Sequence, residues 1–280
     1  MIVVFGATGT IGRRVVSGLV AAGEQVRAFT RDPAGTDFPA PVEVVRGDLE
    51  DAAAVQAAVG GAEAVFVLSA GPRTAVHERT VSEAVRAHGT PRVVKLSSVA
   101  AMPPVRDSYG AIHAAAEEAV KNSGAEWTIL RPAGFMSNVL RWAPSVHAGT
   151  VRQPHGRIPR AVVDPADVSD VAVTCLTAPG HAGAIYQLTG PEALTGADLT
   201  ARLAAALGRP LTFVDLDPGE ARQAMIGAGL PEDYATGLVD TLEDPDPNRG
   251  GTPLPTVEKL LGRPPVTFDA WLARHLGAFG

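Results

Sequence analysis

Residues 1–12 read MIVVFGATGTIG, and this stretch decides the fold. Ile2 to Phe5 is an apolar, partly β-branched run that predicts a buried parallel strand. Arg13 to Ala22 has the periodicity of an amphipathic helix. The glycines between them suit a tight turn, a close approach of pyrophosphate to the backbone, and close packing of helix on strand. The start of the helix then faces the pyrophosphate with free N–H groups. The turn predicts a dinucleotide site made of Gly6, Ala7, Thr8, Gly9, Thr10, Ile11 and Gly12.

The composition excludes several classes of protein. The chain has 280 residues, is 46% hydrophobic and carries a net charge of -6, which argues against a nucleic-acid binder. We see no apolar run long enough for a transmembrane helix and no basic region typical of a signal peptide. Cys175 is the single cysteine and is expected to be a small buried hydrophobe. We expect a cytoplasmic protein, monomeric or homodimeric, that acts on a small molecule without nucleic acid or membrane partners.

Strands and helices alternate along the first half of the chain. Further strands are predicted at 25–30, 42–46, 64–69, 92–96 and 127–130, with helical patterns between them. This order predicts an α/β fold, a Rossmann-type doubly wound parallel sheet whose ligands bind beyond the carboxyl ends of the strands. We expect residues 1–135 to form the dinucleotide-binding core. Residues 136–280 are expected to form a smaller, mainly substrate-binding part, with 164–190 returning to the core. The Pro- and Asp-rich stretch 244–255 predicts a surface loop.

Polar residues follow the next three strands. Arg31 follows the second strand, and a guanidinium there suits the 2′-phosphate of NADP, although the adjacent Asp32 weakens this reading. Asp48 is placed to bond the adenine amino group while Leu49 packs on the ring. The stretch around Asp48 also reads as an N-cap and turn for the helix over 52–59, and the two readings are compatible. Ser69, Ala70 and Gly71 follow the fourth strand, where the nicotinamide ribose would pass. Among these positions, Arg31 favours NADPH over NADH.

Several motifs together carry a family resemblance. They are GATGTIG, TRDP after the second strand, GDLED after the third, LSS after the fifth and TILRPAGFMSN after the sixth. With them the chain resembles the atypical short-chain dehydrogenases/reductases of the NmrA-like type, and is similar to their NAD(P)H:quinone oxidoreductase branch. DPADVSDVA and IYQLTG extend the resemblance to about Gly190. The resemblance implies an NAD(P)H-dependent oxidoreductase, in a group that also contains redox-sensing regulators.

The resemblance also implies catalytic residues. Short-chain reductases carry Tyr-x-x-x-Lys on a helix beside a serine; here the stretch is SYGAIH, so Tyr109 is kept and His113 replaces the lysine. The tyrosine protonates the carbonyl oxygen as hydride arrives. With an ordinary pKa of about 6.5, a histidine is mostly neutral at pH 7 and would lower the pKa of the tyrosine less than a lysine does. The alternative for Tyr109 is a surface aromatic residue, and the alternative for His113 is a solvated helix residue. The implied catalytic residues are Tyr109, His113 and Ser98, and the further cofactor contacts are Ser97, His113, Pro132, Ala133, Gly134 and Phe135.

Three functions follow from these residues. The first is an NADPH-dependent reductase that transfers hydride to a small carbonyl or quinone-type substrate. The others are a redox-sensing, dinucleotide-binding regulator without turnover and a tailoring enzyme that catalyses epimerisation or dehydration with bound NADP.

Trp142 either faces the substrate or lies in the core. His147 and His155 stand in a basic loop without metal-ligand spacing, so we expect no metal.

Overall fold

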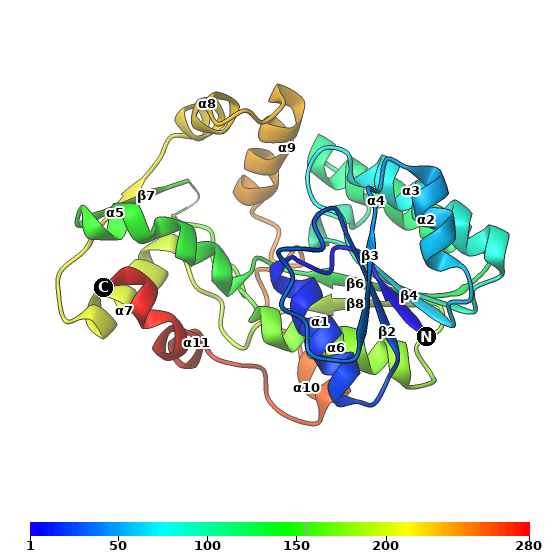
Figure 1. Cartoon of the computed structure of the whole chain (residues 1–280). Coiled ribbons are helices and arrows are strands. Elements are labelled where there is room, and N and C mark those ends of the chain that lie inside the picture. The colour runs from blue at the N-terminus through cyan, green and yellow to red at the C-terminus, as the bar shows by residue number, and fades with distance from the viewer. Residues whose placement is uncertain (155) are drawn as a thin grey trace. The chain divides into compact units, whose positions relative to one another are not determined.

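The computed structural model describes residues 1–154 and 156–280, so His155 lies outside the described residues (Figure 1). The chain forms two compact units, and each is described by itself. The first unit contains Met1–Ala101, Ile112–Arg131 and Val168–Tyr186, and the second contains Met102–Ala111, Pro132–Asp167 and Gln187–Gly280. None of the described helices is both long and apolar enough to span a bilayer.

The first unit is built on a seven-stranded sheet in the order β3-β2-β1-β4-β5-β6-β8. Its neighbours from β3 to β6 pair in parallel, which confirms the predicted doubly wound sheet. The strands are β1 (Ile2–Val4), β2 (Val26–Thr30), β3 (Val42–Arg46), β4 (Ala64–Val67), β5 (Arg92–Leu96), β6 (Glu126–Pro132) and β8 (Ala184–Leu188).

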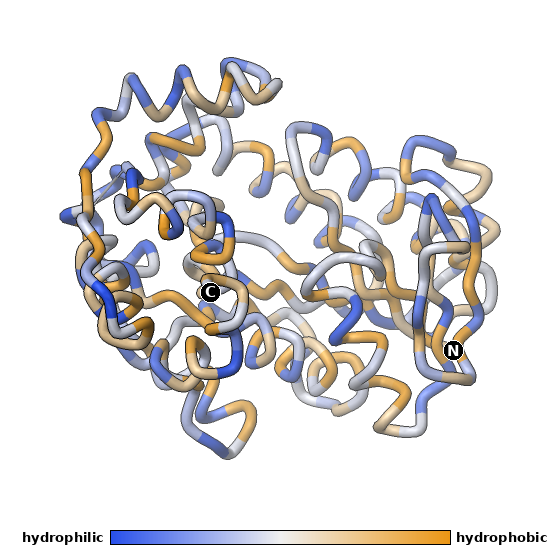
Figure 2. Tube along the Cα trace, turned by 60° about the vertical axis from the view of Figure 1, so that its left-hand side comes forward, coloured by the Kyte–Doolittle hydropathy of each residue, from blue (hydrophilic) through white to orange (hydrophobic). Residues whose placement is uncertain are grey.

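Helices cover both faces of this sheet (Figure 1). On one face, α2, α3 and α4 bury apolar side chains against the strands in a single cluster that includes Val55, Val85 and Val120. On the other face, Gly18 of α1 lies against Val173 of α6. Figure 2 shows hydrophobic and hydrophilic residues alternating along the helices, as one-sided burial requires. The helices are α1 (Thr10–Ala21), α2 (Ala52–Val59), α3 (Thr74–His88), α4 (Ser108–Lys121) and α6 (Pro165–Thr177).

The second unit has its own core. Trp142, Leu203, Phe268 and Trp271 are buried in one cluster, so Trp142 lies in this core as one of its two readings predicted. A small parallel pair joins β7 (Thr150–Gln153) to β9 (Thr212–Asp215). The helices are α5 (Ala143–His147), α7 (Gly196–Leu207), α8 (Pro218–Gly227), α9 (Glu232–Glu243), α10 (Thr256–Leu261) and α11 (Phe268–His275), with 3-10 turns at Val99–Ala101, Met136–Trp142 and Leu276–Phe279 along the chain.

Two expectations about single stretches can be compared with the structure. Cys175 is buried, as expected, and burial raises the pKa of its thiol to about 12. The stretch 244–255 is not simply a surface loop, because Asp244 and Arg249 are buried within it. The Pro and Asp content that predicts exposure is offset here by arginine donors that satisfy the buried carboxylate and carbonyl groups.

Candidate functional site

The glycine turn after β1 combines a fixed backbone with an accessible edge. Gly6 has φ +72°, and a Cβ there would lie 2.6 Å from the carbonyl oxygen of Leu68. A Cβ at Gly12 would lie 2.1 Å from the carbonyl oxygen of Gly6, so α1 packs too closely for any side chain. Gly9 is different, because its Cβ would meet only the Gly6 oxygen, at 3.4 Å. Gly9 is also the N-cap of α1 and supplies no side-chain hydrogen bond, while Thr8 and Thr10 are exposed. The turn thus leaves the amino end of α1 open, which fits a dinucleotide pyrophosphate.

A guanidinium is available after β2. Arg31 is exposed and makes no hydrogen bond or ion pair with any residue that the structure describes. Asp32, the neighbour that weakened the prediction of a phosphate contact, accepts the Ala34 N–H at 3.1 Å within its own turn. Arg13 donates from Nε to the Thr8 carbonyl at 2.9 Å. Of the two arginines, Arg31 is therefore the one whose whole guanidinium is available to a phosphate, while Arg13 has already used its Nε.

The turn after β3 is shaped by Asp48. Its Oδ1 accepts the Glu50 N–H at 3.0 Å, so it shapes the turn. The N-cap of α2 is Asp51, which accepts from Ala53 and Ala54. A turn with an N-cap therefore precedes α2, which spans 52–59 as predicted, and the capping residue is Asp51 rather than Asp48. The Asp48 side chain is exposed, and Leu49 is half-buried against the core.

The turn after β4 is held by two side chains from α3. The Ser69 N–H donates to Glu78 Oε1 at 3.2 Å, and its hydroxyl lies 2.8 Å from His77 Nδ1. Ala70 is exposed and Gly71 has φ +99°, so the chain turns sharply here. His77 and Glu78 were missed by sequence reasoning, because a polar residue on a helix is more often a solvated one.

Beneath the carboxyl ends of β4, β5 and β6 lies a buried layer of charges. Lys95 Nζ donates to Glu78 Oε2, and both side chains are 0% exposed. Glu117 accepts Arg131 Nε at 2.8 Å and Nη2 at 2.6 Å. Burial raises the pKa of Glu78, and the ammonium of Lys95 acts in the opposite direction. A lysine inside the run VVKL was a signal in the sequence, since a buried strand seldom carries a charge without a partner.

The two predicted serines have different surroundings. Ser97 is buried, and its hydroxyl donates to Glu117 Oε1 at 2.5 Å. Ser98 is half-buried, and its oxygen accepts the Ala100 N–H at 3.2 Å. The Ser97 hydroxyl donates its proton to Glu117, whereas the Ser98 oxygen acts only as an acceptor, from the Ala100 N–H. Ser98 is therefore the better candidate to donate a hydrogen bond to an acceptor.

Tyr109 and His113 both lie on α4, one helical turn apart. His113 is buried, and its pKa is lowered to about 3, first by burial and then by the positive charge of Lys95. The imidazole is therefore neutral at physiological pH. It can hydrogen-bond a hydroxyl, but it supplies no positive charge of the kind a lysine would supply. Tyr109 is half-buried, and its ring centroid lies 5.6 Å from that of Tyr234, at an interplanar angle of 68°.

The stretch after β6 is fixed by backbone hydrogen bonds. The Ala133 N–H donates to the Leu188 carbonyl at 2.9 Å, and the Val163 N–H donates to the Gly134 carbonyl at 2.8 Å. Pro132 and Ala133 are buried, while Gly134 and Phe135 are partly accessible. Of the four predicted cofactor contacts here, Gly134 and Phe135 are therefore the two that are accessible to a ligand.

Comparisons with known proteins agree with this geometry. The family described as NAD(P)H-binding matches residues 6–179. The chain is 42% identical to a (4-alkanoyl-5-oxo-2,5-dihydrofuran-3-yl)methyl phosphate reductase of Streptomyces griseus, over 100% of this chain and 99% of that one. It is 35% identical to an NAD(P)H azoreductase of Xenophilus azovorans, over 100% and 99% of the two chains.

A solved structure extends the similarity to three dimensions. An NADPH-dependent quinone oxidoreductase from Escherichia coli, complexed with NADPH, superposes with a TM-score of 0.83. It is 27% identical in sequence, over 98% of this chain and 99% of that one. The similarity therefore includes the last third of the chain, where few sequence motifs were found.

Proposed function

Because this chain belongs to the NAD(P)H-binding family and, within it, to the NmrA-like group of atypical short-chain dehydrogenases/reductases, we propose that it reduces a small conjugated carbonyl or quinone-type substrate with NADPH. It is an NAD(P)H-dependent oxidoreductase. The observation that carries the proposal is the open glycine turn of residues 6–12 together with an unengaged Arg31. That pair supports NADPH over NADH.

The acceptor class is supported by what the relatives are named for. They reduce an alkanoyl-dihydrofuranone phosphate, an azo compound and a quinone. Such acceptors contain conjugated multiple bonds, over which the negative charge of an added hydride spreads. A strong general acid is then less necessary. A neutral His113 beside Tyr109 on α4 suits that chemistry, because it orients groups without supplying charge.

In this proposal, separate residues bind the cofactor, donate the proton and bind the acceptor. NADPH, when bound, supplies the hydride. Residues 6–12 bind the pyrophosphate, Arg31 binds the 2′-phosphate, and Asp48 and Leu49 contact the adenine. Tyr109 donates the proton, and Ser98 hydrogen-bonds the acceptor oxygen. Residues 1–135 provide dinucleotide binding, and residues 136–280 contribute mainly to acceptor binding, with 164–190 belonging to the core.

The proposal also covers the partners, the cellular location and the oligomeric state of the protein. A net charge of -6 supports a small-molecule enzyme rather than a nucleic-acid partner. We expect it to act in the cytoplasm as a monomer or homodimer.

The test is NADPH oxidation with a panel of benzoquinones and saturated ketones, in the wild type and in Tyr109→Phe. We expect Tyr109→Phe to lower kcat on a ketone about 100-fold and on a quinone much less, since a general acid typically contributes about 100-fold or more. Arg31→Ala is the control for cofactor choice and should weaken NADPH binding while leaving NADH binding unchanged. Tight NADPH binding without turnover on any acceptor would instead support a regulator.

A further inference from the structure

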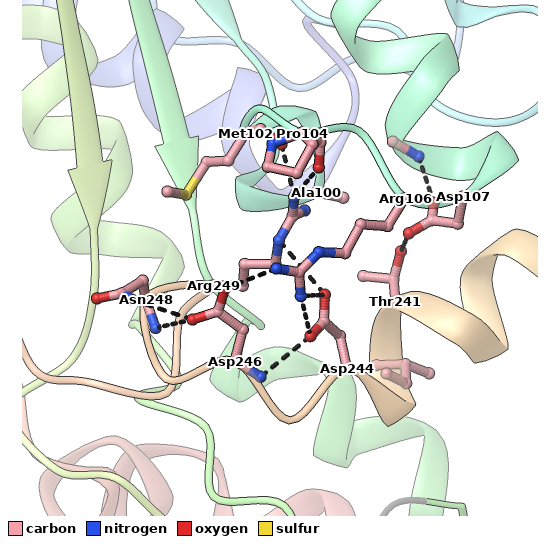
Figure 3. Close-up of polar contacts among 12 residues, drawn as sticks. Ala100, Met102, Pro104, Arg106, Asp107, Thr241, Asp244, Asp246, Asn248 and Arg249 are labelled. Carbon is pink, nitrogen blue, oxygen red and sulfur yellow. Dashed lines mark hydrogen bonds and ion pairs between the residues drawn. The ribbon is translucent and has the colours of Figure 1, made fainter.

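The first turn of α4, which carries Tyr109, is joined to α9 by one carboxylate. Asp107 Oδ1 accepts the Gly110 N–H at 2.6 Å and so caps α4. Its Oδ2 accepts the Thr241 hydroxyl of α9 at 2.9 Å, as Figure 3 shows. The same residue therefore starts one helix and fastens it to another.

Helix α9 also lies against the backbone of this turn. A Cβ at Gly237 would lie 2.3 Å from Ser108 Oγ and 2.5 Å from the Tyr109 nitrogen, so only glycine allows this approach. The Ser108 hydroxyl donates to the Asp233 carbonyl at 2.5 Å. One turn before Gly237, Tyr234 meets the Tyr109 ring edge to face. Tyr109 is thus contacted by α9 at both its backbone and its ring.

The chain that leads into α4 is fixed by arginine pairs (Figure 3). Arg106 Nη1 donates to both oxygens of Asp244, at 2.8 and 3.0 Å, and its Nη2 donates to Asp246 at 3.0 Å. Arg249, which is 5% exposed, donates to the carbonyls of Met102, at 2.6 Å, and of Pro104. These bonds join residues 102–106 to residues 244–249, directly after the end of α9.

A third arginine closes the carboxyl end of α9. Arg160 Nη2 donates to the carbonyls of Thr241 and Leu242, each at 3.0 Å, and of Asp244, at 2.8 Å. These are carbonyls that a helix end leaves without intrahelical partners. The end of α9 and the start of the loop after it are therefore ordered by the donors of the half-buried Arg160.

We propose that α9 is a positioning element for Tyr109, with Gly237 and Tyr234 as the positioning residues that set the place of its ring and hydroxyl. This inference rests on the proposed role of Tyr109 as proton donor. The contact is specific to the first turn of α4, because a Cβ at Gly237 would meet the backbone nitrogens of Tyr109 and Ser108 as well as Ser108 Oγ, and the backbone cannot move aside as a side chain can. The Asp107–Thr241 bond and the arginine pairs keep α9 and this turn in register.

The kinetic test compares two glycines in neighbouring helices. Gly237→Ala should lower kcat on a ketone roughly 10- to 100-fold, because a misplacement of about 1 Å costs up to about 100-fold. Gly227→Ala in α8 is the matched control, since nothing lies within 4 Å of its Cβ, and it should keep the wild-type rate. In a Tyr109→Phe background, Gly237→Ala should change kcat by less than about twofold, because both substitutions act through one hydroxyl. Equal losses in both backgrounds would overturn the proposal.

A spectroscopic test does not depend on activity. The chain has three tyrosines, so 3-fluorotyrosine labelling gives three fluorine resonances, and Tyr109→Phe identifies one of them. Tyr234→Leu and Gly237→Ala should both shift the Tyr109 resonance and leave that of Tyr186 in place. Tyr234→Phe keeps the aromatic ring, so it should have the wild-type rate and a Tyr109 resonance close to its wild-type position. An unmoved Tyr109 resonance overturns the inference even if the enzyme is active. A moved resonance in a protein without turnover supports the packing and refutes the proposed function alone.

Discussion

At the scale of single residues, the three glycines of the first turn have separable roles. The backbone of Gly6 leaves no room for a side chain at Gly12, whereas Gly9 borders open space. We expect Gly9→Val to weaken NADPH binding at least about 10-fold, or about 1.4 kcal/mol, with little change in Tm. Gly12→Ala should instead lower stability by roughly 2 kcal/mol or more. Fluorescence titration with NADPH and thermal melts distinguish the two, and an unchanged Kd in Gly9→Val would contradict the assignment.

The buried imidazole of His113 gives stability a particular pH dependence. Its pKa is lowered to about 3 in the folded chain, from the 6.5 of an ordinary histidine. Above about pH 6.5 both the folded and unfolded states hold a neutral ring, so His113 adds no pH dependence there. As the pH falls from about 6.5 toward 3, only the unfolded chain takes up the proton, and stability is lost.

This loss can be measured on the chain itself. Between about pH 6.5 and pH 5 it amounts to about 2 kcal/mol. Urea unfolding at pH 7 and pH 5 should show it in the wild type, and His113→Gln should have a smaller difference between the two pH values. The same difference in both proteins would mean that other groups cause it.

At the scale of elements, β5 and α3 are joined by the buried pair of Lys95 and Glu78. Lys95→Met leaves the Glu78 carboxylate buried without its partner, so we expect a loss of about 3–5 kcal/mol. The double variant Lys95→Met/Glu78→Leu should recover most of that loss, because it removes both desolvated charges. Urea denaturation of the three proteins tests this, and additive losses in the double variant would argue against a coupled pair.

The elements also show what the sequence can and cannot predict. The strands of the parallel sheet and their alternation with helices followed from apolar runs and glycine punctuation, and the ends of the strands supplied the candidate dinucleotide contacts. The partners of Lys95 and Ser97 did not follow, because Glu78 and Glu117 look like solvated helix residues until tertiary packing brings them to β5. The stretch 244–255 was misread for the same reason, since its burial depends on arginines that are distant in sequence.

At the scale of the whole molecule, neither compact unit is a continuous piece of chain. The first unit needs Val168–Tyr186, which includes most of α6 and the start of β8. A chain cut after residue 135 would leave the face of α1 that contacts Val173 exposed to water. We expect it to show no cooperative thermal transition by circular dichroism, whereas the full chain should melt cooperatively. A sharp transition with retained NADPH binding in the cut chain would show that the missing segment is dispensable.

Helix α4 shares this discontinuity, because Ser108–Ala111 belong to the second unit and Ile112–Lys121 to the first. Domain exchange between relatives therefore has a hidden constraint. A chimera joined at residue 135 would set one parent's α4 against another parent's α9, and any parent with a larger residue at position 237 would push against the foreign helix. Recombinants that exchange Met102–Ala111 together with the carboxyl-terminal half should keep their turnover, and a breakpoint near residue 102 is the one to choose.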